Sequence, residues 1–112
     1  MPKVYVCQVP TKKDNATGSF VPTINIGPAE KHGEVVIMLP SNCSFYATAD
    51  LVVQLKKKLE DYSFEEGDCL LATGDPSIIA AASAILGKQH GRMILLKWDR
   101  FEHTYVQSRI EL

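Results

Sequence analysis

The sequence lacks a charge imbalance, a long apolar run and a secretion signal. Its 12 basic and 13 acidic side chains give a formal net charge of −1, whereas a dedicated nucleic-acid binder usually carries a basic excess. No apolar run approaches the roughly 18 residues of a membrane span, and the N-terminus shows no signal-peptide pattern. We therefore expect a cytoplasmic protein with no membrane partner, and the charge balance argues against a nucleic-acid partner.

Paired cysteines and catalytic motifs are also missing. Cys7, Cys43 and Cys69 are odd in number and show no CxxC spacing, so neither a disulfide framework nor a zinc site is expected. Cys69 begins an apolar run, and we interpret it as a small core residue. A nucleophilic cysteine, or one of the three histidines as a base, is the alternative. We expect no cofactor, no metal and no catalytic residue, which favours a protein that is not an enzyme.

Length and composition predict one folded domain over residues 1–112. A chain of 112 residues buries about two-thirds of its extended surface when it folds. A hydrophobic content of 46% is ordinary for a globular protein. No repeat, low-complexity tract or change of composition marks a domain boundary.

The clearest pattern is a strand, a helix and a second strand. Residues 69–73 and 93–96 are short apolar runs, typical of strands that are covered on both faces. Between them the sequence predicts a helix over 76–90, with Asp75 at the N-cap and Gly91 just after the last turn. Strand, helix and strand in about 30 residues form a βαβ unit, so the two strands should be parallel neighbours.

The rest of the chain predicts four more strands and one amphipathic helix. These strands cover residues 3–9, 20–26, 35–39 and 105–112, the helix starts at Thr48 or Ala49, and the polar segment 10–19 is an exposed loop. The order β-β-β-α-β-α-β-β predicts an α/β fold, with α+β as the alternative. We expect a single mixed sheet of about six strands, with one parallel βαβ unit at 69–98 and a C-terminal β-hairpin.

Polar residues follow both strands of the βαβ unit. Thr73, Gly74 and Asp75 come after the first strand, and Asp99 and Arg100 come after the second. Ligands of open α/β sheets bind outside the carboxyl ends of the strands, so these residues form a candidate ligand-binding crevice. Its two carboxylates could bind a divalent cation or act as an acid–base pair. The alternative is local: Asp75 caps the helix and Asp99 begins the last turn.

The helix over 76–90 also suggests self-association. It carries no charge before Lys88, whereas a helix on the outer layer of a small domain normally has a polar face. Either the N-terminal strands or a second copy of the chain would cover its other side. In the second case Ala81 and Ala84 lie in a contact between two copies, and a homodimer is expected. Trp98 is a second interface candidate, because aromatic residues often anchor interfaces. Its alternative role is packing under the terminal hairpin.

The runs GDPSIIAAASAI and GRMILLKWDR, with Tyr105 and the preceding VVIMLP, resemble small proteins of short-tailed bacteriophages of the marine, cyanophage type. The resemblance spans most of the chain and implies a phage product in the cytoplasm of an infected bacterium. It carries no catalytic residue across. We expect a non-enzymatic accessory protein that binds a host or phage macromolecule, with a protein as its partner. The alternative is a small ligand- or metal-binding domain or enzyme that uses the Asp75/Asp99 crevice.

Overall fold

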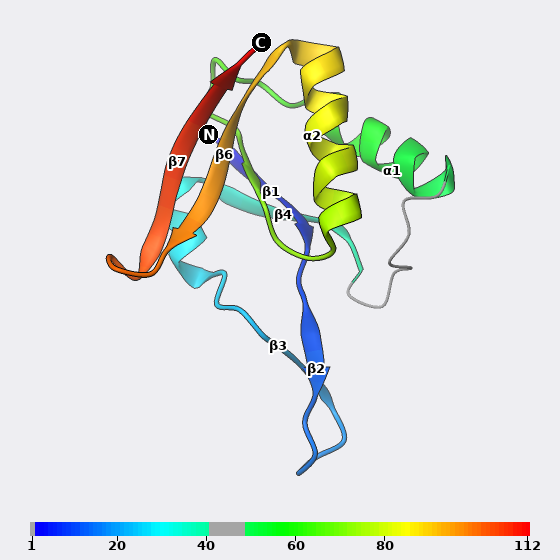
Figure 1. The fold of residues 1–112 in the computed structure, drawn as a ribbon, viewed down its shortest axis with the longest axis vertical. Coiled ribbons are helices and arrows are strands. Elements are labelled where there is room, and N and C mark those ends of the chain that lie inside the picture. The colour runs from blue at the N-terminus through cyan, green and yellow to red at the C-terminus, as the bar shows by residue number, and fades with distance from the viewer. Residues whose placement is uncertain (1, 41–48) are drawn as a thin grey trace.

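The computed structural model describes residues 2–40 and 49–112. A five-stranded mixed sheet has two helices on one face and a short 3-10 helix on the other (Figure 1). In chain order the elements are β1 (Lys3–Gln8), β2 (Thr11–Lys13), β3 (Phe20–Pro22), the 3-10 helix η1 (Gly27–His32), β4 (Glu34–Leu39), α1 (Ala49–Leu59), β5 (Cys69–Leu71), α2 (Pro76–His90), β6 (Arg92–Asp99) and β7 (Thr104–Glu111).

The sheet has the strand order β4-β1-β5-β6-β7. Its first four strands are parallel, and β7 runs antiparallel to β6 as the second arm of the C-terminal hairpin. The predicted βαβ unit is confirmed, since β5 and β6 are parallel neighbours in which Cys69 faces Ile94 and Leu71 faces Leu96. The mixed sheet and its C-terminal hairpin are therefore as the sequence indicates.

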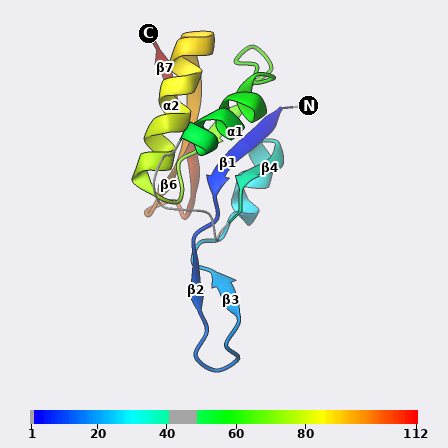
Figure 2. The same cartoon turned by 90° about the vertical axis from the view of Figure 1, so that its right-hand side faces the viewer.

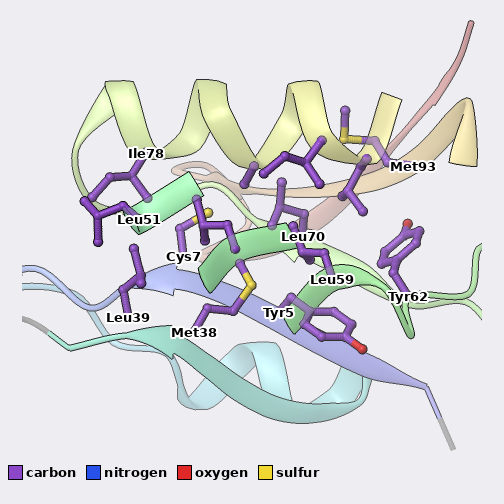
Figure 3. Packing of buried hydrophobic residues seen from close by; sticks show 14 residues of the cluster. Tyr5, Cys7, Met38, Leu39, Leu51, Leu59, Tyr62, Leu70, Ile78 and Met93 are labelled. Atoms are coloured by element: carbon purple, nitrogen blue, oxygen red, sulfur yellow. The ribbon is translucent and has the colours of Figure 1, made fainter. Parts of the chain in front are cut away.

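Both faces of the central strands β1 and β5 are buried, which explains why these two strands are continuous apolar runs, whereas β7 at the edge alternates. On one face, α1 and α2 pack over Tyr5, Cys7 and Leu70 (Figure 3). On the other face, Ala29 of η1 joins a second cluster that includes Leu71. One apolar layer therefore lies under the helices and another under the segment that contains η1.

The N-terminal part departs from the expected single sheet of about six strands. Strands β2 and β3 pair only with each other, as a separate hairpin that projects from the body (Figures 1 and 2). The segment 10–19, expected to be a loop, contains β2. The run 20–26 is a strand only as far as Pro22. The Thr23 N–H still donates to the Pro10 carbonyl oxygen across the hairpin at 2.8 Å, but Pro10 has no N–H to donate in return.

The projecting hairpin also explains the elongated shape of the molecule. Its radius of gyration is 14.1 Å, against about 13 Å for a compact domain of this length. On the hairpin the Phe20 side chain is 71% exposed, so this arm buries little apolar surface of its own. No helix in the part of the chain that the structure describes is long and apolar enough to cross a membrane.

Candidate functional site

A pocket of about 460 Å³ opens at the carboxyl edge of β5 and β6, on the η1 face of the sheet. Leu71 and Leu96 come from the two strands, and Trp98 and Tyr105 come from the C-terminal hairpin. The opposite wall is the segment 23–25 between β3 and η1. A volume of this size lies within the range of small-molecule sites.

The pocket lies one strand away from the point where the connections of the sheet diverge. Numbered along the chain, the four parallel strands have the order 2-1-3-4, which matches a common doubly wound arrangement. The chain leaves β1 towards the η1 face, whereas it leaves β5 towards the face that carries α2, so the usual ligand crevice of such sheets would open between β1 and β5. The pocket is at the same edge of the sheet but over β5 and β6, and β1 contributes none of its lining residues.

Two aromatic rings set one wall of the pocket. The Tyr105 hydroxyl donates a hydrogen bond to the Asn25 carbonyl oxygen at 3.0 Å, which ties the segment 23–25 to the sheet. Burial raises the pKa of Tyr105, so its phenol stays protonated at neutral pH. The Trp98 ring packs edge-on against Tyr105, with 5.0 Å between the ring centroids. Trp98 is still 44% exposed, so the expected packing under the hairpin covers only part of the indole.

The rim of the pocket is fixed by a close approach between β1 and the β5–α2 turn. The Thr73 hydroxyl donates to the Gln8 carbonyl oxygen at 2.9 Å. Gly74 has φ +97°, and a Cβ atom there would lie 2.9 Å from the Gln8 Cβ, so this position requires glycine. Gln8 is 2% exposed and donates its side-chain N–H to the Pro40 carbonyl oxygen at 3.1 Å. Sequence reasoning missed Gln8, whose only signal was a polar residue at the end of an apolar strand.

Asp75 and Asp99 have the local roles that formed the alternative interpretation. Asp75 accepts hydrogen bonds from the Ser77 N–H and hydroxyl, at 2.8 and 2.6 Å, and so caps α2. These bonds lower the pKa of Asp75, the one from the Ser77 hydroxyl most strongly. Asp99 accepts from the Phe101 N–H at 2.9 Å and the Glu102 N–H at 3.3 Å.

The two carboxylates therefore hold their own turns, and neither lines the 460 Å³ pocket. Across residues 2–40 and 49–112, no group of three or more His, Cys, Asp or Glu side chains is placed to hold a metal ion. Of the predicted ligand-binding set, Thr73 alone lines this pocket. Arg100 and Asp99 line a smaller depression of about 330 Å³ beside the same tryptophan.

The turn between β6 and β7 exposes aromatic and basic side chains together. Lys97, Trp98, Arg100 and Phe101 are all exposed, and Phe101 is 93% exposed. We call these four residues the turn surface. The Asp99 carboxylate accepts two N–H groups of this turn, and β6 pairs continuously with β7 on either side of it. A large apolar side chain is thus presented to water at the end of a paired hairpin.

A comparison with models of known protein families matches residues 2–112 to the Phage Pam3 gp32-like protein family. The chain belongs to this family. The resemblance to small phage proteins is therefore confirmed over nearly the whole chain. Neither the search of curated proteins nor the search of solved structures found a match.

In this member of the Pam3 gp32-like family, the described cysteines are core residues. Cys7 and Cys69 are fully buried, and burial raises the pKa of their thiols to about 12 and about 11. The interpretation of Cys69 as a core residue is confirmed, and Cys43 lies outside the described residues. Of the predicted interface alanines, Ala81 packs partly buried against the helix-face cluster, whereas Ala84 is exposed.

Proposed function

We propose that this phage-family protein is a non-enzymatic module that holds a protein partner, from the phage or its host, on the turn surface. The observation that carries the proposal is the 93% exposure of Phe101 on the turn of the β6–β7 hairpin, beside Trp98 and Arg100. We also propose that the protein acts in the cytoplasm of the infected bacterium, and its membership of a phage family supports this.

The chemistry of the turn surface defines the kind of partner. Tryptophan and arginine are enriched among the residues that dominate interface energies, and here Trp98 and Arg100 lie next to Phe101. Lys97 and Arg100 are exposed cations, and Asp99 already accepts two backbone N–H groups. The matching surface is an apolar pocket that receives Phe101, with acidic side chains at its rim.

Affinity capture from phage-infected host cells tests this proposal with two matched variants. Phe101→Ser removes the proposed anchor, and Phe20→Ser removes an exposed phenylalanine from the other hairpin. We expect wild type and Phe20→Ser to retain the same partner and Phe101→Ser to lose it. The captured partner is then purified, and we expect Phe101→Ser to weaken its binding by at least about tenfold. Equal binding by wild type and Phe101→Ser would contradict the proposal.

A further inference from the structure

We infer that the 460 Å³ pocket binds a small, uncharged heteroaromatic ring that carries N–H or amino donors, such as the base of a free nucleoside. This site is separate from the proposed protein contact, with which it shares only Trp98. Three properties of its walls define the ligand class: the lack of ionised side chains, the state of the hydroxyl groups, and the exposed indole.

The lining residues carry no formal charge. They are threonines, an asparagine, aliphatic side chains, a tryptophan and a tyrosine. The tyrosine, Tyr105, stays a neutral phenol at pH 7 because burial raises its pKa. An ionised ligand would lose hydration here without meeting a charge of opposite sign. The pocket therefore favours an uncharged molecule.

The hydroxyl groups of the pocket already use their O–H groups as hydrogen-bond donors within the protein. Those of Thr23, Thr73 and Tyr105 each donate to a backbone carbonyl oxygen, at 3.2, 2.9 and 3.0 Å. A hydroxyl that donates in this way still has lone pairs on its oxygen. These three hydroxyls can therefore only accept hydrogen bonds from a ligand, which favours a ligand edge that carries N–H or amino groups. The donors among the lining side chains are the Asn25 amide and the Trp98 indole N–H, which can bind an acceptor nitrogen of the same ring.

The indole of Trp98 favours a flat ligand. It borders the pocket while 44% of the residue is exposed, and aromatic rings stack well on tryptophan. Ile24 and Ala72, both part-buried, add accessible apolar surface, and the fully buried Leu71 and Leu96 lie beneath it. A planar ring that covers the indole while its edge donates to the threonine oxygens uses all three properties.

Trp98 is the only tryptophan in the chain, so its fluorescence reports occupancy of the pocket directly. We choose adenosine as the donor-bearing probe. N6,N6-dimethyladenosine is the matched probe without amino protons, and adenosine 5′-monophosphate is the charged probe. We expect adenosine to quench Trp98 saturably. We expect the dimethyl analogue to bind about tenfold more weakly, because it cannot donate to the threonine oxygens. The monophosphate should also bind more weakly than adenosine.

Two exposed threonines give a matched pair of variants. Thr23→Val removes an acceptor oxygen from the pocket. Thr17→Val removes a threonine at the tip of the projecting hairpin, where its hydroxyl donates to Asp14. We expect Thr23→Val to weaken adenosine binding several-fold and Thr17→Val to leave it unchanged. The inference is overturned by an absence of saturable quenching at millimolar adenosine, by equal binding of adenosine and its dimethyl analogue, by tighter binding of the monophosphate, or by equal affinities for the two variants.

Discussion

The two ends of the parallel strands are built differently. At the amino edge, Asp68 is buried and hydrogen-bonded, and Arg92 pairs with Glu65. At the carboxyl edge lie the pocket and the exposed residues of the turn surface. The β6–β7 turn and the β2–β3 hairpin lie at this same end of the molecule (Figure 1). This contrast separates the groups that support the fold from those that are available to a ligand or partner.

Asp68 is the centre of the amino edge. It is 2% exposed, and it accepts hydrogen bonds from the Lys3 and Ser63 N–H groups, each at 2.9 Å. Nearby, Arg92 pairs with Glu65 and places its guanidinium 4.5 Å from the centre of the Phe64 ring. The charges of Asp68, Arg92 and Glu65 thus have partners within the same chain.

The carboxyl edge also contains an aspartate that accepts two backbone hydrogen bonds, but its surroundings are more exposed. Asp99 also accepts two backbone N–H groups, yet it does so in an exposed turn where water can replace the carboxylate. A lost hydrogen bond is costly only where the remaining donors are hidden from water. The same residue type should therefore matter for stability at one edge and very little at the other.

The largest effect is expected from a paired substitution at the two edges. Asp68→Ala leaves two part-buried N–H groups unpaired, and we expect it to lower the free energy of unfolding by about 2 kcal/mol. Asp99→Ala should cost under about 1 kcal/mol, because its donors turn to water. Urea denaturation of both variants measures the difference. Similar losses of unfolding free energy in the two variants would contradict the proposed difference between the edges.

Much of this fold could be predicted from the sequence because its signals are local. The apolar runs at 69–73 and 93–96, with Asp75 and Gly91 at the two ends of α2, are sufficient for the βαβ unit. Strand β2 gave no such signal, since Lys12 and Lys13 face water and pair only with β3. The separate hairpin was missed for this reason.

The long-range polar contacts at both edges could not be predicted, because their partners are distant in the chain. Asp68 binds the N–H of Lys3, 65 positions away, and Gln8 binds the Pro40 carbonyl, 32 positions away. The general rule for open sheets points to the carboxyl edge, where the pocket lies, but of the predicted residues Thr73 alone lines it. Its wall at 23–25 comes from a segment that showed only a weak strand pattern.

A dimer through α2 stays a prediction. If it forms, the surface of α2 is a third region to compare with the two edges of the sheet. Ala84 is exposed on α2, so Ala84→Glu should not unfold the domain. We expect light scattering to give the mass of two copies for wild type and one copy for Ala84→Glu. Gln89→Glu, which adds a charge at another exposed position of the helix, should leave the dimer intact. A wild-type mass of one copy at high concentration would exclude it.

A smaller effect is expected from the cap of α2. Asp75→Ala should lower the melting temperature at neutral pH by a few degrees, and Asp75→Asn by less, because asparagine also caps helices. The pKa of Asp75 is lowered in the folded protein, so its contribution is present above the ordinary aspartate pKa and is lost as pH falls through the folded value. Thermal melts should show the wild type and Asp75→Ala converging well below pH 4. A constant difference down to pH 2 would count against the cap.

The smallest expected effect concerns the core thiols. Cys7 and Cys69 are fully buried with pKa values of about 12 and about 11, so at pH 8 they should be protonated and inaccessible. In a Cys43→Ser variant, Ellman's reagent should therefore give almost no reaction until denaturant is added. The denatured variant supplies the control by releasing two thiols. Rapid reaction of the folded variant would show that the core opens readily.

Hydrogen–deuterium exchange, with and without the captured partner, tests most directly whether the carboxyl edge is the contact edge. We predict that the partner slows exchange in peptides that contain the β6–β7 turn, around Phe101, and leaves unchanged those that contain the amino-edge residues 63–68. Slowed exchange at 63–68 with an unaffected turn would contradict the account.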